Sequence, residues 1–389
     1  MELSVFLSVI EVGPPYIGSL AGTRRYAYSL INSLALQGIN ITVVSTNKLD
    51  SKDELLDQPN IKFYYIKPRK KRKEGYRKNI SSIKRESKYF SKKSLEYFLE
   101  LQKKQKFHII HTIDFSSLAF IKAKKEDKII TPVIASISNP IIAYYLKRKH
   151  VNCLDQIIYT NKKSKEKSLR LFPNTGNKSV VIPLSIDCTR FSQIPKIEDI
   201  DEFTQKYDLQ RERDIILILG PFIPRKKQKE LVSLFPRIVQ RNPNCFFLFC
   251  GEGPTLTSIK EKIISYHLED YSSFTGYITE DELQIAYHIS SVLIYPAESG
   301  SFGTPIIESL ASGLPVIAAD KPPMNEIVSK EYLYSIENRD KIVDIIISTI
   351  EKRKNENIST FDLQKDAIKE YHHTIVGKKI LKLYEKIVE

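Results

Sequence analysis

A loop of small residues and a nearby carboxylate form a pattern in this sequence that suits an anionic ligand. The apolar run Val292–Tyr295 predicts a buried strand, and the loop Ala297–Gly303 leads from it into a helix expected over Thr304–Ser312. The backbone N–H groups of such a loop and the helix N-terminus favour a bound anion. Glu308 lies about one turn inside this helix, where its carboxylate can accept hydrogen bonds from ribose hydroxyls.

The elements around this loop predict a parallel sheet. Gly313 follows the helix as a C-cap, and Leu314–Ala318 has the composition of a second buried strand, so the segment is a βαβ unit. Ligands of open parallel sheets bind beyond the carboxyl ends of the strands. The loop Ala297–Gly303 is expected at that edge.

Strand and helix patterns alternate along the whole chain, which predicts an α/β fold of two doubly wound, Rossmann-like domains with a cleft between them. In the first half, the expected strands are Leu3–Ile10, Ile41–Ser45, Ile61–Ile66, Phe107–His111, Pro132–Ile137, Gln156–Thr160 and Ser179–Pro183, with helices at Gly22–Gln37 and Ile80–Lys104. After a polar linker, the expected strands are Ile215–Leu219, Cys245–Cys250 and Ser273–Thr275, and the expected helices are Gln228–Arg241, Leu256–Tyr266, Glu280–His288, Asp340–Arg353 and about 363–388.

The composition is that of a folded protein without a membrane span. The chain has 389 residues, enough for two domains, and 42% of them are apolar. No apolar run approaches the length of about 18 residues that a spanning helix needs. The apolar start of the chain carries an acid and no basic lead, so it is expected to be a strand and not a signal peptide. The four cysteines have no metal-binding spacing, which indicates reduced thiols in the cytoplasm.

The positive charge of the chain is concentrated in one segment. The formal net charge is +14, and the segment 67–106 holds sixteen Lys or Arg against four Glu, a local net charge of +12. Such a segment attracts polyanions such as anionic lipid, pyrophosphate or nucleic acid. The alternative is a solvated helical face with a flexible loop. No recognised nucleic-acid-binding motif accompanies the charge, so no nucleic acid partner is expected.

The segment around Glu308 resembles the signature of the family 4 glycosyltransferases, which have the GT-B fold. Ser301–Glu308 matches the second half of that signature, and Ser309–Ile317 matches the helix and strand that follow it. The resemblance implies that Glu308 holds the nucleotide ribose. The family's other glutamate, which touches the donor sugar, is replaced by Gly300, and Glu298 is the candidate substitute. The implied nucleotide-sugar site further includes the backbone of Gly300, Ser301, Phe302, Gly303 and Thr304.

The resemblance covers nearly the whole chain, because further motifs follow in the family's order. Ala21–Leu30 resembles the family's Gly-Gly loop and first helix, with Gly22 as the second glycine and Ala21 in place of the first. Val181–Asp187 resembles the crossover between the domains, where Leu184 and Ser185 replace an Asn-Gly pair. Gly251–Pro254 and Phe274–Tyr277 also match, and the resemblance implies that Gly276 and Tyr277 lie near the nucleotide base.

A departing sugar diphosphate gains negative charge, so cations and backbone donors aimed at its phosphates are the main catalytic device. In the family, the loop that matches Gly220–Lys226 supplies an arginine and a lysine. Lys226 stands at the lysine position, so the resemblance implies a phosphate contact. Pro221 replaces the arginine, and Arg225 is the candidate for the missing charge. The alternative is a solvent-facing turn with unattached cations.

The sugar pocket departs from the family a second time. Ser138 stands where the family commonly has a histidine. His111, expected at a strand end, is the other candidate for a catalytic or acceptor role, although a lone histidine there is more often structural. Asp114 follows it in a loop. Glu326 lies in the loop after the strand Pro315–Ala318, where the family often has an acid. The alternative is an acid at a helix N-terminus, which the helix dipole favours without any ligand.

The resemblance implies a retaining glycosyltransferase that uses a nucleoside-diphosphate sugar, in the UDP or GDP form, without a metal or other cofactor. Residues 1–190 would bind a glycan or lipid-linked acceptor and residues 191–389 the donor, with the last helix, about 363–388, crossing back to the first domain. The expected role is polysaccharide or glycoconjugate synthesis at the cytoplasmic face of a membrane, with 67–106 on the anionic surface. The alternatives are a catalytically inactive protein that binds a sugar nucleotide, motivated by Gly300 and Ser138, and a basic nucleic-acid-binding protein.

Overall fold

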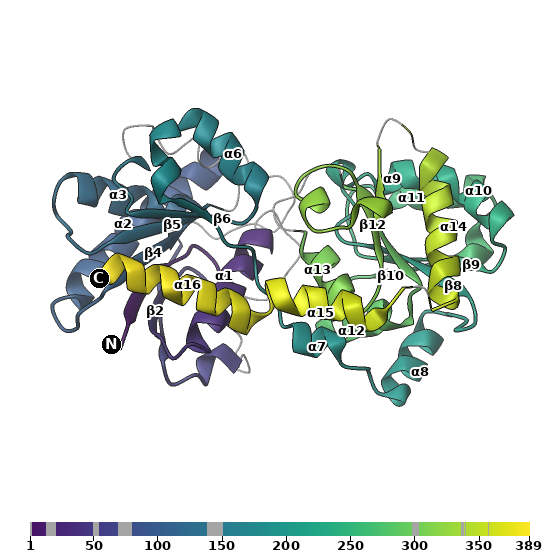
Figure 1. The fold of residues 1–389 in the computed structure, drawn as a ribbon, viewed down its shortest axis with the longest axis horizontal. Coiled ribbons are helices and arrows are strands. Elements are labelled where there is room, and N and C mark those ends of the chain that lie inside the picture. Colours follow the sequence, from purple (N-terminus) through teal and green to yellow (C-terminus); the bar gives the residue numbers. More distant parts are fainter. Residues whose placement is uncertain are drawn as a thin grey trace. The chain divides into compact units, whose positions relative to one another are not determined.

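The computed structural model describes residues 2–12, 21–49, 54–68, 80–137, 151–297, 303–335, 338, 340–356 and 358–389. The chain divides into two compact units: unit 1 is Met1–Ser185 with His373–Glu389, and unit 2 is Ile186–His372 (Figure 1). Each unit contains a parallel sheet with helices packed against it. The predicted fold class, α/β with two doubly wound sheets, is confirmed.

Unit 1 contains a seven-stranded sheet in the order β3-β2-β1-β4-β5-β6-β7. Its strands are β1 (Ser4–Ser8), β2 (Asn40–Ser45), β3 (Ile61–Tyr65), β4 (Ile109–Ile113), β5 (Val133–Ile137), β6 (Gln156–Tyr159) and β7 (Ser179–Val181). Central strands such as β4 and β5 are buried at every position, since both faces of the sheet are covered.

The helices of unit 1 are α1 (Ala21–Ala35), α2 (Ile80–Leu101), α3 (Leu118–Lys125), α6 (Lys162–Leu171) and α16 (His373–Val388). An aromatic core that includes Phe6, Phe98 and Phe120 lies between the sheet and the pair α2 and α3. Helices α1 and α16 pack together, and their close approach requires Gly377, because a Cβ atom there would lie 2.3 Å from the Ser33 carbonyl oxygen.

Unit 2 contains a six-stranded sheet in the order β10-β9-β8-β11-β12-β13. Its strands are β8 (Asp214–Leu219), β9 (Cys245–Cys250), β10 (Ser272–Gly276), β11 (Val292–Tyr295), β12 (Val316–Ala319) and β13 (Leu333–Tyr334). The helices are α7 (Cys188–Ser192), α8 (Ile197–Lys206), α9 (Gln228–Leu231), α10 (Phe235–Arg241), α11 (Leu256–Ser265), α12 (Glu280–Ile289), α13 (Thr304–Ala311), α14 (Asp340–Lys354) and α15 (Thr360–Tyr371). Helices α10, α11 and α14 bury one apolar face of the sheet. Helices α12 and α13 also contact the sheet, and α7 and α15 pack against α13.

Two predicted helices are wrong in extent. The helix expected over about 363–388 is two helices, because His372 adopts an extended conformation between α15 and α16 and forms a bridge with Ile186. Only α16 belongs to unit 1. The helix expected over Gln228–Arg241 is interrupted by a 3-10 turn at Val232–Leu234, and α10 restarts with Pro236 in its first turn, where a missing N–H costs no hydrogen bond.

Candidate active site

Three loops are joined at the carboxyl edge of the unit 2 sheet. Gly220 follows β8, Gly251 follows β9 and Gly276 ends β10. The Gly220 N–H donates to the Cys250 carbonyl at 3.0 Å, and the Gly251 N–H donates to the Gly276 carbonyl at 2.8 Å. All three glycines have positive φ angles. The loops therefore approach one another by backbone, at the edge where a parallel sheet binds its ligand.

Two positions in the loop after β9, Gly251 and Gly253, accept only glycine. A Cβ atom at Gly251 would lie 2.2 Å from the Gly220 carbonyl oxygen, and one at Gly253 would lie 2.3 Å from the Phe222 carbonyl oxygen. Their φ angles are 141° and 154°, a region that other residues rarely adopt. The Phe222 N–H donates to the Glu252 carbonyl at 2.8 Å. The Gly251–Pro254 motif thus holds the loop after β8 in place.

The loop after β8 brings Lys226 to the end of β11. Lys226 ends a short 3-10 turn, Pro224–Lys226, and its side chain is half-buried. The ammonium group donates a hydrogen bond to the hydroxyl of Tyr295, the last residue of β11, and lies 4.4 Å from the centroid of that ring. A cation above a tyrosine ring is stabilised by the ring quadrupole. The structure thus places Lys226 at the carboxyl edge of the sheet, where the sequence predicts a phosphate contact.

Arg225 is exposed in the same turn, beside Lys226. Pro221, which stands where an arginine was expected, accepts a hydrogen bond from the buried amide of Gln228 at 3.3 Å. Gln228 follows Lys227, whose φ of 60° turns the chain into α9. Sequence analysis missed Gln228, since a single amide in a basic segment carries no pattern. Its role here is to hold the loop that carries both cations.

Glu308 is buried in α13, with 1% of its surface exposed. Its Oε2 atom accepts a hydrogen bond of 3.0 Å from the hydroxyl of Tyr287, which lies in α12 and is fully buried. A buried carboxylate is stable only with such hydrogen bonds, because desolvation of the charge is costly. Sequence analysis missed Tyr287, which looks like an ordinary apolar position of an amphipathic helix.

Gly303 and Thr304 form the start of α13. Gly303 is the N-cap residue with a φ of 66°, Thr304 is buried and Pro305 occupies the first turn. A Cβ atom at Gly303 would lie 3.0 Å from the Cδ1 atom of Ile327, so a side chain would crowd the η7 region, Met324–Glu326. Glu326 is exposed at the end of that turn. The predicted site residues Glu298, Gly300, Ser301 and Phe302 lie outside the described residues, as does Ser138 of unit 1.

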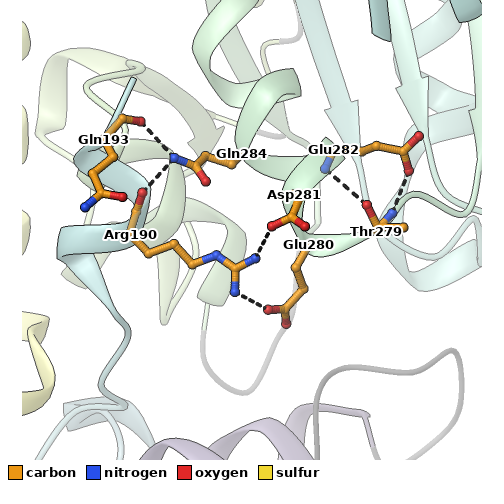
Figure 2. Close-up of polar contacts among 7 residues, drawn as sticks. All are labelled: Arg190, Gln193, Thr279, Glu280, Asp281, Glu282 and Gln284. Atoms are coloured by element: carbon orange, nitrogen blue, oxygen red, sulfur yellow. Dashed lines mark hydrogen bonds and ion pairs between the residues drawn. The ribbon is translucent and has the colours of Figure 1, made fainter. Parts of the chain in front are cut away.

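The candidate base-binding residues precede α12. Gly276 has a φ of 68°, and Tyr277 is 47% exposed. Helix α12 then begins with a capping box: the Glu282 N–H donates to Thr279 Oγ1 at 3.2 Å, and the Thr279 N–H donates to Glu282 Oε2 at 2.8 Å (Figure 2). The segment from Gly276 to Thr279 is therefore short and fixed at both ends.

In unit 1, His111 lies inside β4 and not after its end, because the strand continues to Ile113. The ring is fully buried, and its Nδ1 and Nε2 atoms form hydrogen bonds with the hydroxyls of Tyr384, at 2.5 Å, and Ser136, at 2.7 Å. Burial lowers the pKa of His111 to about 3, so the ring is neutral at physiological pH. This geometry, with both ring nitrogens hydrogen-bonded, supports a structural role.

The network continues from His111 into α1. The Tyr26 hydroxyl donates to the Ser136 hydroxyl at 2.7 Å, and burial raises the pKa of Tyr26. Gly22 lies in the first turn of α1, and the hydroxyl of Thr23 donates to Oδ2 of Asp114 at 3.2 Å. Asp114 is buried with a φ of 53°, directly after β4. Asp114 thus places a carboxylate with a positive φ at the carboxyl edge of the unit 1 sheet.

Within the described part of the chain, no cluster of three His, Cys, Asp or Glu side chains is arranged to hold a metal ion. Among the helices described, none has the length and apolar composition needed to span a bilayer.

Residues 199–370 match the sequence profile of the family Glycosyl transferases group 1. An alpha-monoglucosyldiacylglycerol synthase of Streptococcus pneumoniae is 23% identical over 325 residues, which are 81% of this chain and 71% of that protein. The next relatives match over about half of their own length.

Solved structures match along the whole chain. A glycosyltransferase from Rickettsia africae superimposes with a TM-score of 0.75 at 17% identity, covering 100% of this chain and 99% of that one. The Anabaena protein Alr3699/HepE, solved in complex with UDP, superimposes with a TM-score of 0.73 at 14% identity, covering 99% of this chain and 100% of that one. At these identities the similarity shows the fold.

Proposed function

Because the chain is a glycosyltransferase of the GT-B fold, with residues 199–370 in the group 1 family, we propose that it moves a hexosyl unit from a nucleoside-diphosphate sugar to a glycan or lipid-linked acceptor with retention of configuration. The observation that carries this proposal is the position of Lys226 and Tyr295 at the carboxyl edge of the unit 2 sheet. A fixed cation at that edge suits a diphosphate leaving group.

Each part of the donor has a candidate partner in unit 2. Glu308 accepts hydrogen bonds from the ribose hydroxyls, and Lys226 stabilises the charge that develops on the departing diphosphate. Arg225 adds a second cation from the same turn. The diphosphate charge is thus met by side chains, and the proposal includes no metal ion. Gly276 and Tyr277 contact the base through their backbone and ring.

UDP is the first donor nucleotide to test, because the similar fold of Alr3699/HepE was solved with UDP, and GDP is the alternative. The experiment measures the melting temperature of the chain with UDP, GDP, ADP and their hexose derivatives, followed by a transfer assay with the best donor. A ligand that binds only the folded state raises the melting temperature. If none of these nucleotides shifts it, and no sugar is transferred, the proposal is wrong.

The charge of unit 1 supports an acceptor on an anionic surface. Unit 1 holds 38 of the 60 Lys and Arg residues and 17 of the 46 Asp and Glu residues, so its net charge is +21. The Streptococcus pneumoniae relative is named for a glycolipid product. We therefore propose a lipid-linked acceptor on an anionic membrane, engaged by unit 1 through the segment 67–106, of which residues 69–79 lie outside the described residues. Each engaged basic side chain contributes about 1 kcal/mol.

Co-sedimentation with vesicles tests this docking. The parent chain should bind vesicles that contain phosphatidylglycerol at low salt and be released at 1 M salt, where the Debye length is about 3 Å. A variant with Arg69, Lys70, Lys71, Arg72 and Lys73 changed to Ser should bind less. A charge-matched control has the same change at Lys196, Lys229, Lys330, Lys365 and Lys369 of unit 2 and should bind like the parent. If the parent ignores anionic vesicles, a soluble glycan acceptor is the better assignment.

A further inference from the structure

A buried tyrosine lies against the carboxylate that the proposed function assigns to the ribose. Tyr287 has no exposed surface, and its hydroxyl donates to Oε2 of Glu308 at 3.0 Å. A hydrogen bond to a charged acceptor is stronger than one between neutral groups. The carboxyl group of Glu308 has lone pairs on two oxygens, so a donor on Oε2 restricts its rotation and sets the direction in which Oε1 points.

The ring of Tyr287 is itself fixed by α7, the first helix of unit 2. Phe191 of α7 meets it edge to face, with ring centroids 5.9 Å apart and planes at 75°. Phe191 is also buried. An aromatic pair in this geometry is favourable beyond its area of burial. The Tyr287 ring is therefore packed against a buried ring of α7 while its hydroxyl contacts Glu308.

Polar contacts fasten α7 to α12, as Figure 2 shows. The guanidinium of Arg190 donates to Glu280 at 2.9 Å and to Asp281 at 2.7 Å. The amide of Gln284 donates to the carbonyls of Arg190 and Gln193, each at 2.8 Å. Helix α7 is thus held against α12, the helix that carries Tyr287, through residues that flank Phe191 in sequence.

We propose that Tyr287 is a positioning residue for donor binding: its hydroxyl holds the Glu308 carboxylate in the orientation that accepts the ribose hydroxyls. The inference rests on the ribose role given to Glu308 under the proposed function. Fixing a side chain before binding lowers the entropy lost when the ligand arrives, so Tyr287 increases affinity without touching the ligand. Its effect should be confined to ligands that have ribose hydroxyls.

The experiment compares two forms of one nucleotide. Calorimetry measures the dissociation constants of UDP or GDP, whichever raises the melting temperature of the parent more, and of its 2′,3′-dideoxy form. The parent should bind the ribose form about tenfold or more tightly than the dideoxy form, because hydrogen bonds to a charged group are lost. Tyr287→Phe should weaken the ribose form severalfold and leave the dideoxy form unchanged. The ratio is insensitive to partial unfolding, which lowers both affinities equally.

Tyr207→Phe is the matched control, since it also removes a tyrosine hydroxyl from a glutamate, Glu282, at 3.3 Å in unit 2. It should keep the parent's ratio. In steady-state assays, Tyr287→Phe should raise KM for the donor more than it lowers kcat. Suppose that Glu308→Gln abolishes the preference for the ribose form. If Tyr287→Phe then weakens both nucleotides equally, or weakens neither, the inference about Tyr287 is wrong. If Glu308→Gln keeps that preference, the ribose assignment itself is wrong, and the inference falls with it.

Discussion

In both units a tyrosine hydroxyl contacts a polar side chain, but the contacted groups differ in charge and in their position along the strands. In unit 2, Tyr295 accepts a hydrogen bond from the Lys226 ammonium and Tyr287 donates one to the Glu308 carboxylate. In unit 1, Tyr384 pairs with the neutral ring of His111. Lys226 and Glu308 follow the strands, in a loop and a helix, whereas His111 lies within β4 and is covered on both sides.

The comparison shows that the position of a side chain relative to the strand end decides whether it can serve a ligand or serves packing. A side chain beyond the strand end can meet a ligand, because the sheet no longer covers it. A side chain inside a central strand meets only other side chains, so it must be neutral and hydrogen-bonded. The net charge also differs between the units: unit 2 has −7 and unit 1 has +21.

The largest effect is expected from a substitution in the hydrogen-bonded loops of unit 2. Gly253→Ala places a Cβ atom 2.3 Å from a backbone oxygen at a φ of 154°, so it should cost about 3 kcal/mol or more and remove nucleotide binding. Thermal unfolding with and without UDP measures both effects. Gly176→Ala in unit 1, where a Cβ atom meets nothing within 4 Å, is the matched control. A stable Gly253→Ala chain that binds nucleotide would show that the close loop contact is not needed.

The second prediction concerns the cation of unit 2. Lys226→Ala should lower kcat about 100-fold or more, as expected for the loss of one group that stabilises a developing negative charge, and should weaken nucleotide binding less. Arg225→Ala should act in the same direction. Steady-state kinetics on both variants decide whether each residue acts in the active site or is only a surface cation. Lys229, an exposed lysine nearby, supplies the control variant Lys229→Ala. Normal turnover in Lys226→Ala would remove it from the site.

The third prediction tests the neutral histidine of unit 1. The folded pKa of His111, about 3, lies below its ordinary value of 6.5, so the unfolded chain binds a proton first as pH falls. Stability from this group is present above pH 6.5 and is lost as pH falls toward 3, by about 2 kcal/mol at pH 5. His111→Gln should be less stable at pH 7 but should lose less stability between pH 7 and pH 5, as measured by urea unfolding. Equal losses would show that the ring charges freely in the fold.

Removal of metal ions is expected to have no effect on the transfer rate. Because the side chains of Lys226 and Arg225 are assigned the diphosphate charge, a chelator such as EDTA should leave the transfer rate of the parent unchanged. A rate that falls with EDTA and returns with added Mg²⁺ would assign that charge to a bound ion. Unit 2 would then differ from unit 1 by a bound metal ion, and not by the Lys226 cation.

Much of this protein was determined by its sequence alone. Apolar runs such as Ile215–Leu219 and Cys245–Cys250 are strands in the structure because continuous apolar segments can only be buried between two helical layers. The glycines at positions 220, 251 and 276 mark strand ends, since their φ angles exclude most other residues. These local rules were sufficient to predict the α/β class and to place the loop that carries Lys226 directly after a strand, whereas the phosphate role of Lys226 was implied by the family resemblance.

Only the tertiary structure decided which groups contact each other. Tyr287 and Glu308 belong to two different helices, and no sequence pattern predicts the hydrogen bond between them. Tyr295 has the pattern of a buried strand residue, and its contact with Lys226 is equally unpredicted. The break at His372 depends on a bridge to Ile186, which no periodicity records. His111 was expected at a strand end and is central, because the register of β4 between β1 and β5 sets where the strand stops. Such contacts depend on packing between distant segments, and local propensity contains no information about them.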